Sequence, residues 1–106
     1  MMQDLDRQIV LELSSRLKAV MSILDLRVFG SRARGDAQED SDLDVFIKVA
    51  DLDRSLREKI HELAWEVGFD HDRVISTFVV TETQIQIGAV GASPLLSKVL
   101  AEGVAV

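Results

Sequence analysis

Two aspartates in this chain have the residue type and spacing of a metal site. Asp42 and Asp44 lie two positions apart, at the start of the apolar run 43–49. On a β-strand alternate side chains share a face, so the two carboxylates are neighbours. They repel each other unless a cation lies between them or one is protonated. Because Mg²⁺ is held by one or two carboxylates together with substrate phosphates, the pair predicts a magnesium site.

A glycine–serine pair twelve positions upstream predicts a phosphate site. Gly30 and Ser31 follow a short apolar run and precede residues 32–34, which suit a helix. A strand, a tight turn and a helix start together bind anions, because free backbone N–H groups and the positive end of the helix dipole point there. Gly30 allows a phosphate to approach the backbone, and the Ser31 hydroxyl can donate to it. Gly35 is expected to end the helix in a left-handed cap. A phosphate site and a metal site in one such unit predict nucleotide handling.

The two motifs together carry a family resemblance. Gly30-Ser31, ten intervening residues and Asp42-Leu43-Asp44 give the pattern Gly-Ser, ten residues, Asp-x-Asp. This resembles the minimal nucleotidyltransferases of the DNA polymerase β-like superfamily, and the internal G-S-R-A-R-G and S-D-L-D are typical of that family. The resemblance extends from about Leu17 to Val80 and implies the nucleotidyltransferase fold.

The resemblance also implies roles for individual residues. Asp42 and Asp44 would be the catalytic residues and would hold one or two Mg²⁺ ions. ATP would be the substrate, with its β- and γ-phosphates at Gly30 and Ser31. A nearby arginine would contact the triphosphate, and Arg34 is the preferred candidate over Arg32.

The family's third carboxylate is missing from its expected place. It normally lies on the neighbouring strand, and the run 74–80 puts Ser76 at that position. A serine supplies neither an anionic metal ligand nor a base, so the alternative is a catalytically impaired nucleotidyltransferase-like module. Asp70 and Asp72 have the same parity as Ser76 and would share its face if the strand reached that far.

The catalytic core accounts for the 106 residues, so the acceptor surface is expected to come from another chain. By resemblance, that partner is a HEPN-domain protein, and this chain is the antitoxin of a two-component toxin–antitoxin module. It would act by adenylylating its partner or, in the impaired alternative, by direct contact. Transfer to a small molecule such as an aminoglycoside is a third, less expected possibility.

The elements that must position these residues follow from periodicity. The order is α-β-α-β-α-β-α, which predicts a single α/β domain over residues 1–106 with a small mixed sheet of three to four strands covered by helices. Helix 4–24 would begin at Asp4 or Asp6, and Trp65 and Phe69 would pack in the core or at its rim. The predicted strands are 26–29, 43–49 and 74–80. A second helix is predicted over 53–67 and a short one over about 94–102, while 81–92 form a connection whose pattern indicates no particular element.

Composition narrows the functional classes. The 106 residues carry a net charge of −6 and contain no cysteine. An acidic chain lacks the basic footprint of a nucleic-acid binder, so free DNA or RNA is not expected as a partner. No apolar run reaches the length of a membrane span and no signal layout is present, so a cytoplasmic protein is expected, as a homo- or hetero-oligomer.

Overall fold

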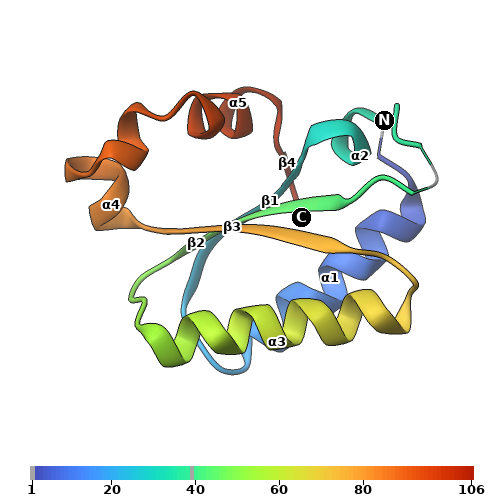
Figure 1. Ribbon diagram of the computed structural model, residues 1–106, viewed down its shortest axis with the longest axis horizontal. Coiled ribbons are helices and arrows are strands. Elements are labelled where there is room, and N and C mark those ends of the chain that lie inside the picture. Colours follow the sequence, from blue (N-terminus) through green and yellow to red (C-terminus); the bar gives the residue numbers. More distant parts are fainter. Residues whose placement is uncertain (1, 39) are drawn as a thin grey trace.

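A four-stranded mixed sheet lies at the centre of the protein (Figure 1). The computed structural model describes residues 2–38 and 40–106. The strand order is β3-β2-β1-β4, with β1 antiparallel to both β2 and β4, and β2 parallel to β3. The strands are β1 (Ile23–Phe29), β2 (Leu43–Val49), β3 (Ile75–Thr81) and β4 (Val104–Ala105). The predicted small mixed sheet is confirmed.

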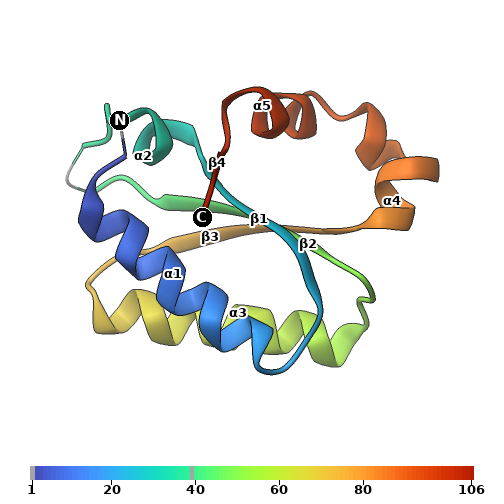
Figure 2. The same ribbon diagram turned by 180° about the vertical axis from the view of Figure 1, so that it is seen from behind.

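Helices cover both faces of this sheet. In Figures 1 and 2, α1 and α3 lie together on one side of the sheet, and α2, α4 and α5 lie on the other. The helices are α1 (Asp4–Lys18), α2 (Gly30–Arg34), α3 (Arg54–Asp70), α4 (Glu82–Ile87), the short 3-10 helix η1 (Ala89–Ala92) and α5 (Pro94–Glu102). The site residues at the start of β2 therefore lie on a strand that is packed on both faces.

The alternation of β2 builds two cores. Its first, third, fifth and seventh residues are fully buried between the sheet and the layer of α1 and α3, as predicted. On the opposite face Phe46 packs with Val80, Leu96 and Val99, partly beneath α5, and meets the ring of Phe78 edge-on at 5.7 Å between centroids. Because both faces are covered, β2 is a rigid support for the two aspartates at its start.

The first helix is shorter than its apolar pattern predicts. It ends at Lys18, and β1 begins at Ile23, so the predicted helix 4–24 is wrong beyond residue 18. Val20 and Leu24 continue the apolar spacing but are about half exposed. Its N-cap is Gln3, and Asp6 is a buried side chain rather than a cap.

The C-terminal third contains three short elements that the sequence pattern does not predict, namely α4, η1 and β4. Within 81–92, Thr81 and Gln84 form a capping box that starts α4, and η1 follows. Ser93 caps α5 by accepting from the Leu95 N–H at 3.2 Å, as its Ser-Pro start predicts. The two-residue β4 pairs with Arg27 and Val28 of β1 and closes that edge of the sheet. In the part of the chain that the structure covers, no helix combines the length and apolarity needed to cross a membrane.

Candidate active site

The turn between β1 and α2 brings the backbone against an aspartate. Gly30 has φ of +73°, in the left-handed region that favours glycine. A Cβ placed on it would lie 2.6 Å from Oδ2 of Asp44, which is too close for any other residue without a shift of that carboxylate. Gly35 has φ of +83° and caps α2, with its N–H donating to the Ser31 carbonyl oxygen at 2.9 Å. The predicted left-handed cap is confirmed.

The pairing of β1 with β2 explains this contact. Phe29, the last residue of β1, is the antiparallel partner of Asp44, so Asp44 lies beside the start of the turn. Asp42 is exposed just before β2, and Asp44 is partly buried. Burial, and then the negative charge of Asp42, raise the pKa of Asp44 above its ordinary value of 3.8. The structure therefore brings the acid pair and the glycine–serine turn together.

The donor set fits a hard divalent cation. Two carboxylates of like charge, one of them partly desolvated, are stabilised by a cation between them. In the two described ranges no three His, Cys, Asp or Glu side chains gather as a metal cluster. Mg²⁺ at this site would therefore need additional oxygen ligands from phosphate and water. The five-residue α2 is too short for a large dipole, but the N–H groups of Gly30 and Ser31 have no acceptor inside the helix.

Ser76 lies next to Asp44 on the adjacent strand. The two residues are direct partners in the parallel pairing of β2 with β3, so their side chains share a face at a strand spacing of about 4.8 Å. Asp70 and Asp72 do not join them. Asp70 is the last residue of α3, and Asp72 has φ of +55° in the turn before β3 starts at Ile75. The strand does not extend far enough to bring either acid to that face.

Comparison with known proteins identifies the family. The sequence profile of the nucleotidyltransferase domain matches residues 6–100. The chain belongs to the nucleotidyltransferase domain family. No curated protein sequence matches it well enough to be counted as a relative.

Solved structures share the fold of this nucleotidyltransferase domain. A minimal nucleotidyltransferase is 30% identical, with a TM-score of 0.58, over 92% of this chain and 86% of that one. A chain of a toxin–antitoxin complex crystallised with AMP-PNP is 22% identical, with a TM-score of 0.65, over 92% and 69%. A chain of the complex of tri-AMPylated Shewanella oneidensis HEPN toxin with MNT antitoxin is 22% identical, with a TM-score of 0.57, over 98% of this chain and 71% of that one. The predicted resemblance to minimal nucleotidyltransferases and their fold is confirmed.

The two arginines of the nucleotidyltransferase motif have different surroundings. Arg34 is exposed and pairs with Asp36 at 3.2 Å and with Glu102 at 3.5 Å. Arg32 is 3% exposed, donates from Nε and Nη2 to the Ser41 carbonyl oxygen at 3.2 and 2.9 Å, and lies 3.5 Å from Asp6. Arg32 therefore holds the residue immediately before Asp42, and Arg34 is the one that faces solvent.

Sequence reasoning missed a buried ionic cluster of Asp6, Arg32 and Arg73. The two oxygens of Asp6, a side chain only 1% exposed, lie 3.5 Å from Arg32 and 3.6 Å from Arg73. The cluster joins α1, α2 and the turn before β3. Asp6 looked like a helix cap because it lies near the start of an amphipathic segment, and no local signal distinguishes the two roles.

A broad open hollow of about 1440 Å³ lies beside the site, against α3 and β3. Its lining includes Trp65 and Phe69, whose rings stack at 5.2 Å between centroids. They are 67% and 71% exposed, so the expectation that they pack in the core or at its rim is wrong.

Proposed function

We propose that this chain is a magnesium-dependent nucleotidyltransferase that transfers AMP from ATP to a hydroxyl group of a partner protein. The observation that carries this proposal is the contact of Asp44 with the Gly30 turn, with Asp42 two residues away. Carboxylates that can hold a cation, at the start of β2, lie beside backbone N–H groups that can bind a phosphate, in the turn from β1 into α2. That is the combination that a metal-chelated triphosphate requires.

Each residue has a role in this proposal. Asp42 and Asp44 would hold Mg²⁺, which would neutralise phosphate charge. The N–H groups of Gly30 and Ser31 and the Ser31 hydroxyl bind the β- and γ-phosphates. Arg34 exchanges its exposed carboxylate partners for the triphosphate. The protein acts mainly by positioning and by charge.

The chemical step is a substitution at phosphorus. The acceptor hydroxyl oxygen bonds to the α-phosphorus, the bond from that phosphorus to the bridging oxygen of the β-phosphate breaks, and pyrophosphate leaves. Ser76 offers no carboxylate to take the hydroxyl proton, so this proton passes to water. We therefore expect slow transfer compared with a site that has a positioned base.

The proposed partner is a HEPN-domain protein, with this chain as the antitoxin of a toxin–antitoxin pair. Support comes from the family and from the fold shared with a chain of the complex of AMPylated HEPN toxin with MNT antitoxin. The chain would act as a single minimal domain, residues 1–106, in the cytoplasm, and the acceptor surface would be completed by the partner.

Mass spectrometry of the partner tests this function. Incubation of the HEPN-domain protein with ATP, Mg²⁺ and this chain should raise the partner's mass by whole AMP units. The Asp42→Asn/Asp44→Asn double variant should give no gain. A gain that persists with the double variant would refute the assignment of these two residues.

The second candidate function is neutralisation by stoichiometric contact, and Ser76 in place of a third carboxylate is the observation that favours it. It predicts that the double variant protects cells from the toxin as well as the wild type does, with no AMP on the partner. Loss of protection together with loss of transfer would exclude it.

A further inference from the structure

The outer edge of β3 is a free sheet edge among the described residues, because β3 is the last strand in the order β3-β2-β1-β4. The Leu43 N–H donates to the Val74 carbonyl oxygen at 2.8 Å, and Leu43 is the parallel partner of Ile75. In a parallel ladder only every second residue of a strand bonds to a given neighbouring strand. The bond to Val74 therefore means that the even-numbered residues of β3 bond to β2. The backbone N–H and C=O groups of Ile75 and Thr77 therefore point away from β2, toward the hollow that both residues line.

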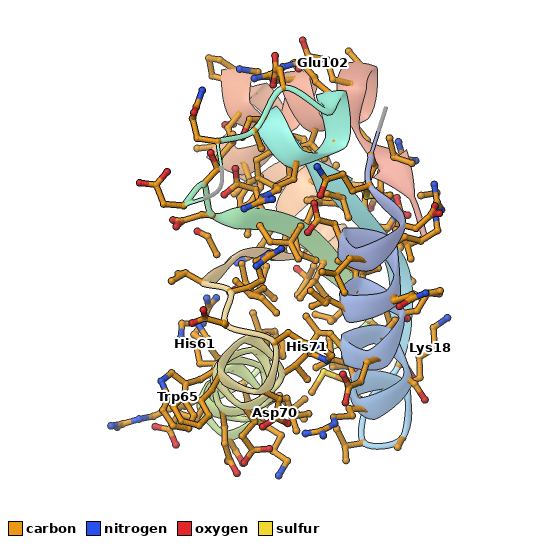
Figure 3. All side chains as sticks on the ribbon, turned by 90° about the vertical axis from the view of Figure 1, so that its right-hand side faces the viewer. Lys18, His61, Trp65, Asp70, His71 and Glu102 are labelled. Atoms are coloured by element: carbon orange, nitrogen blue, oxygen red, sulfur yellow. The ribbon has the colours of Figure 1, made fainter. Side chains whose placement is uncertain are left out.

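The hollow beside this edge combines apolar surface with acidic groups. Trp65, Phe69 and Val74 line it, and each is about two-thirds exposed or more. Figure 3, which looks along α3, shows Trp65 and His61 on the side of that helix away from α1. An exposed aromatic pair beside unpaired strand edges is unusual on a monomer surface and marks an interaction site.

The charges of the hollow have one predominant sign. Asp40, Glu62 and Asp72 lie in its lining, and each is exposed. The basic residue among them, Arg73, is turned inward, with Nε 3.6 Å from the buried Asp6. A segment that complements this surface is therefore basic as well as apolar, and the net charge of −6 favours the same kind of partner.

We propose that the free edge of β3 and this hollow bind an extended segment of the acceptor protein that carries basic and apolar side chains. The segment adds a fifth strand to the sheet through the outward groups of Ile75 and Thr77. Trp65 and Phe69 receive its apolar side chains, and the acidic residues face its basic ones. The inference rests on the proposed function and specifies how the acceptor is held.

Strand addition at this edge also places an acceptor hydroxyl near the site. Alternate residues of an added strand point to opposite faces of the sheet, some toward the hollow and some toward the face of Ser76 and Asp44. The strand lies about 4.8 Å beyond β3 and about 9.6 Å beyond β2. A long side chain that ends in a hydroxyl reaches from there toward Asp44. The transfer step is the one described above, with the same bonds formed and broken.

Variants on the exposed aromatic pair test the proposal, with the HEPN-domain protein as the acceptor probe. Trp65→Ser/Phe69→Ser should raise the KM for the acceptor about tenfold or more, as loss of aromatic anchors does at interfaces, and leave the KM for ATP unchanged. Ile87→Ser, at a side chain 82% exposed on α4, is the matched control and should change neither. An unchanged acceptor KM in the double variant would overturn the proposal.

Charge reversal gives an independent measurement. Glu62→Lys, in the hollow, should raise the acceptor KM, and Glu58→Lys, one turn earlier on α3 and outside the lining, should not. Equal effects of the two variants would contradict the charge match.

Light scattering of the chain alone tests the other occupant of a free edge, a second copy of this chain. A dimer that Trp65→Ser/Phe69→Ser dissociates would mean that a second copy covers this edge. If the wild type transfers no AMP, the proposed function fails first; if it transfers and the variants match it, only the docking inference fails.

Discussion

Asp44 is the residue on which the proposed chemistry of this site depends. It contacts the Gly30 turn, it is the register partner of Ser76, and it is close enough to Asp42 for the charge of that residue to raise its pKa. A carboxylate that is costly to ionise in the free protein gains most from a cation or from loss of its charge. The raised pKa predicts how stability depends on pH, and the pairing with Ser76 predicts how an acid at position 76 affects transfer.

The first prediction concerns the dependence of folding stability on pH. The raised pKa means that the folded protein holds the Asp44 proton more tightly than the unfolded chain does. The stability that this provides is fully present below the ordinary value of 3.8 and is lost as pH rises through the raised pKa. In EDTA at neutral pH, Asp44→Asn should therefore unfold at higher urea than the wild type, and the difference should shrink as the pH falls to 3.8 and below. A difference that stays constant over this range in urea titrations would contradict the cause assigned here.

The second prediction concerns the rate of AMP transfer when an acid replaces Ser76. Ser76→Asp should place an acid beside Asp44 on the same face and speed AMP transfer to the partner by about tenfold or more, because a positioned base contributes rate factors of that size. Ser76→Asn, which is of similar size but uncharged, is the control. Single-turnover transfer assays measure both, and equal rates for the two variants would show that the position does not serve the reaction.

The turn from β1 into α2 sets the distance between the Gly30 backbone and the Asp44 carboxylate, which are the proposed phosphate and metal groups. Gly30→Ala should destabilise the fold by about 1–2 kcal/mol through its left-handed backbone, and it should also weaken AMP-PNP binding because the new Cβ displaces the Asp44 carboxylate. Gly35→Ala has a similar positive φ and should cost similar stability with no loss of binding. Urea denaturation and calorimetry together separate the two effects, and equal loss of binding in both variants would refute the role of the contact.

The buried cluster of Asp6, Arg32 and Arg73 links three segments near the site. Arg32→Met leaves the Asp6 carboxylate, which is 1% exposed, without one of its two arginines and releases the Ser41 carbonyl. We expect a loss of about 3 kcal/mol or more in the free energy of unfolding, because breaking a buried pair strands a charge. Arg34→Met, at an exposed side chain, should cost less than about 1 kcal/mol. Comparable urea midpoints for the two variants would show that the cluster contributes little.

For the whole molecule, sequence patterns predicted the parts whose causes are local. The alternation of β2, the Gly-Ser turn and the left-handed Gly35 cap each follow from a few neighbouring residues, and so the acid pair was predicted at the correct end of the correct strand. The end of α1 at Lys18 was not predictable because Val20 and Leu24 continue its apolar spacing without being buried. The Asp6 cluster and the free edge of β3 depend on contacts between distant segments, which no local pattern reports.

Calorimetric titration with AMP-PNP tests whether the acid pair and the Gly-Ser turn form one site for a metal-chelated triphosphate. The wild type should bind AMP-PNP in the presence of Mg²⁺. Its affinity should fall by about tenfold or more in EDTA and equally in Asp42→Asn/Asp44→Asn, where the cation has lost its ligands. Binding that is as tight in the double variant, or that does not need Mg²⁺, would show that the two motifs do not form such a site.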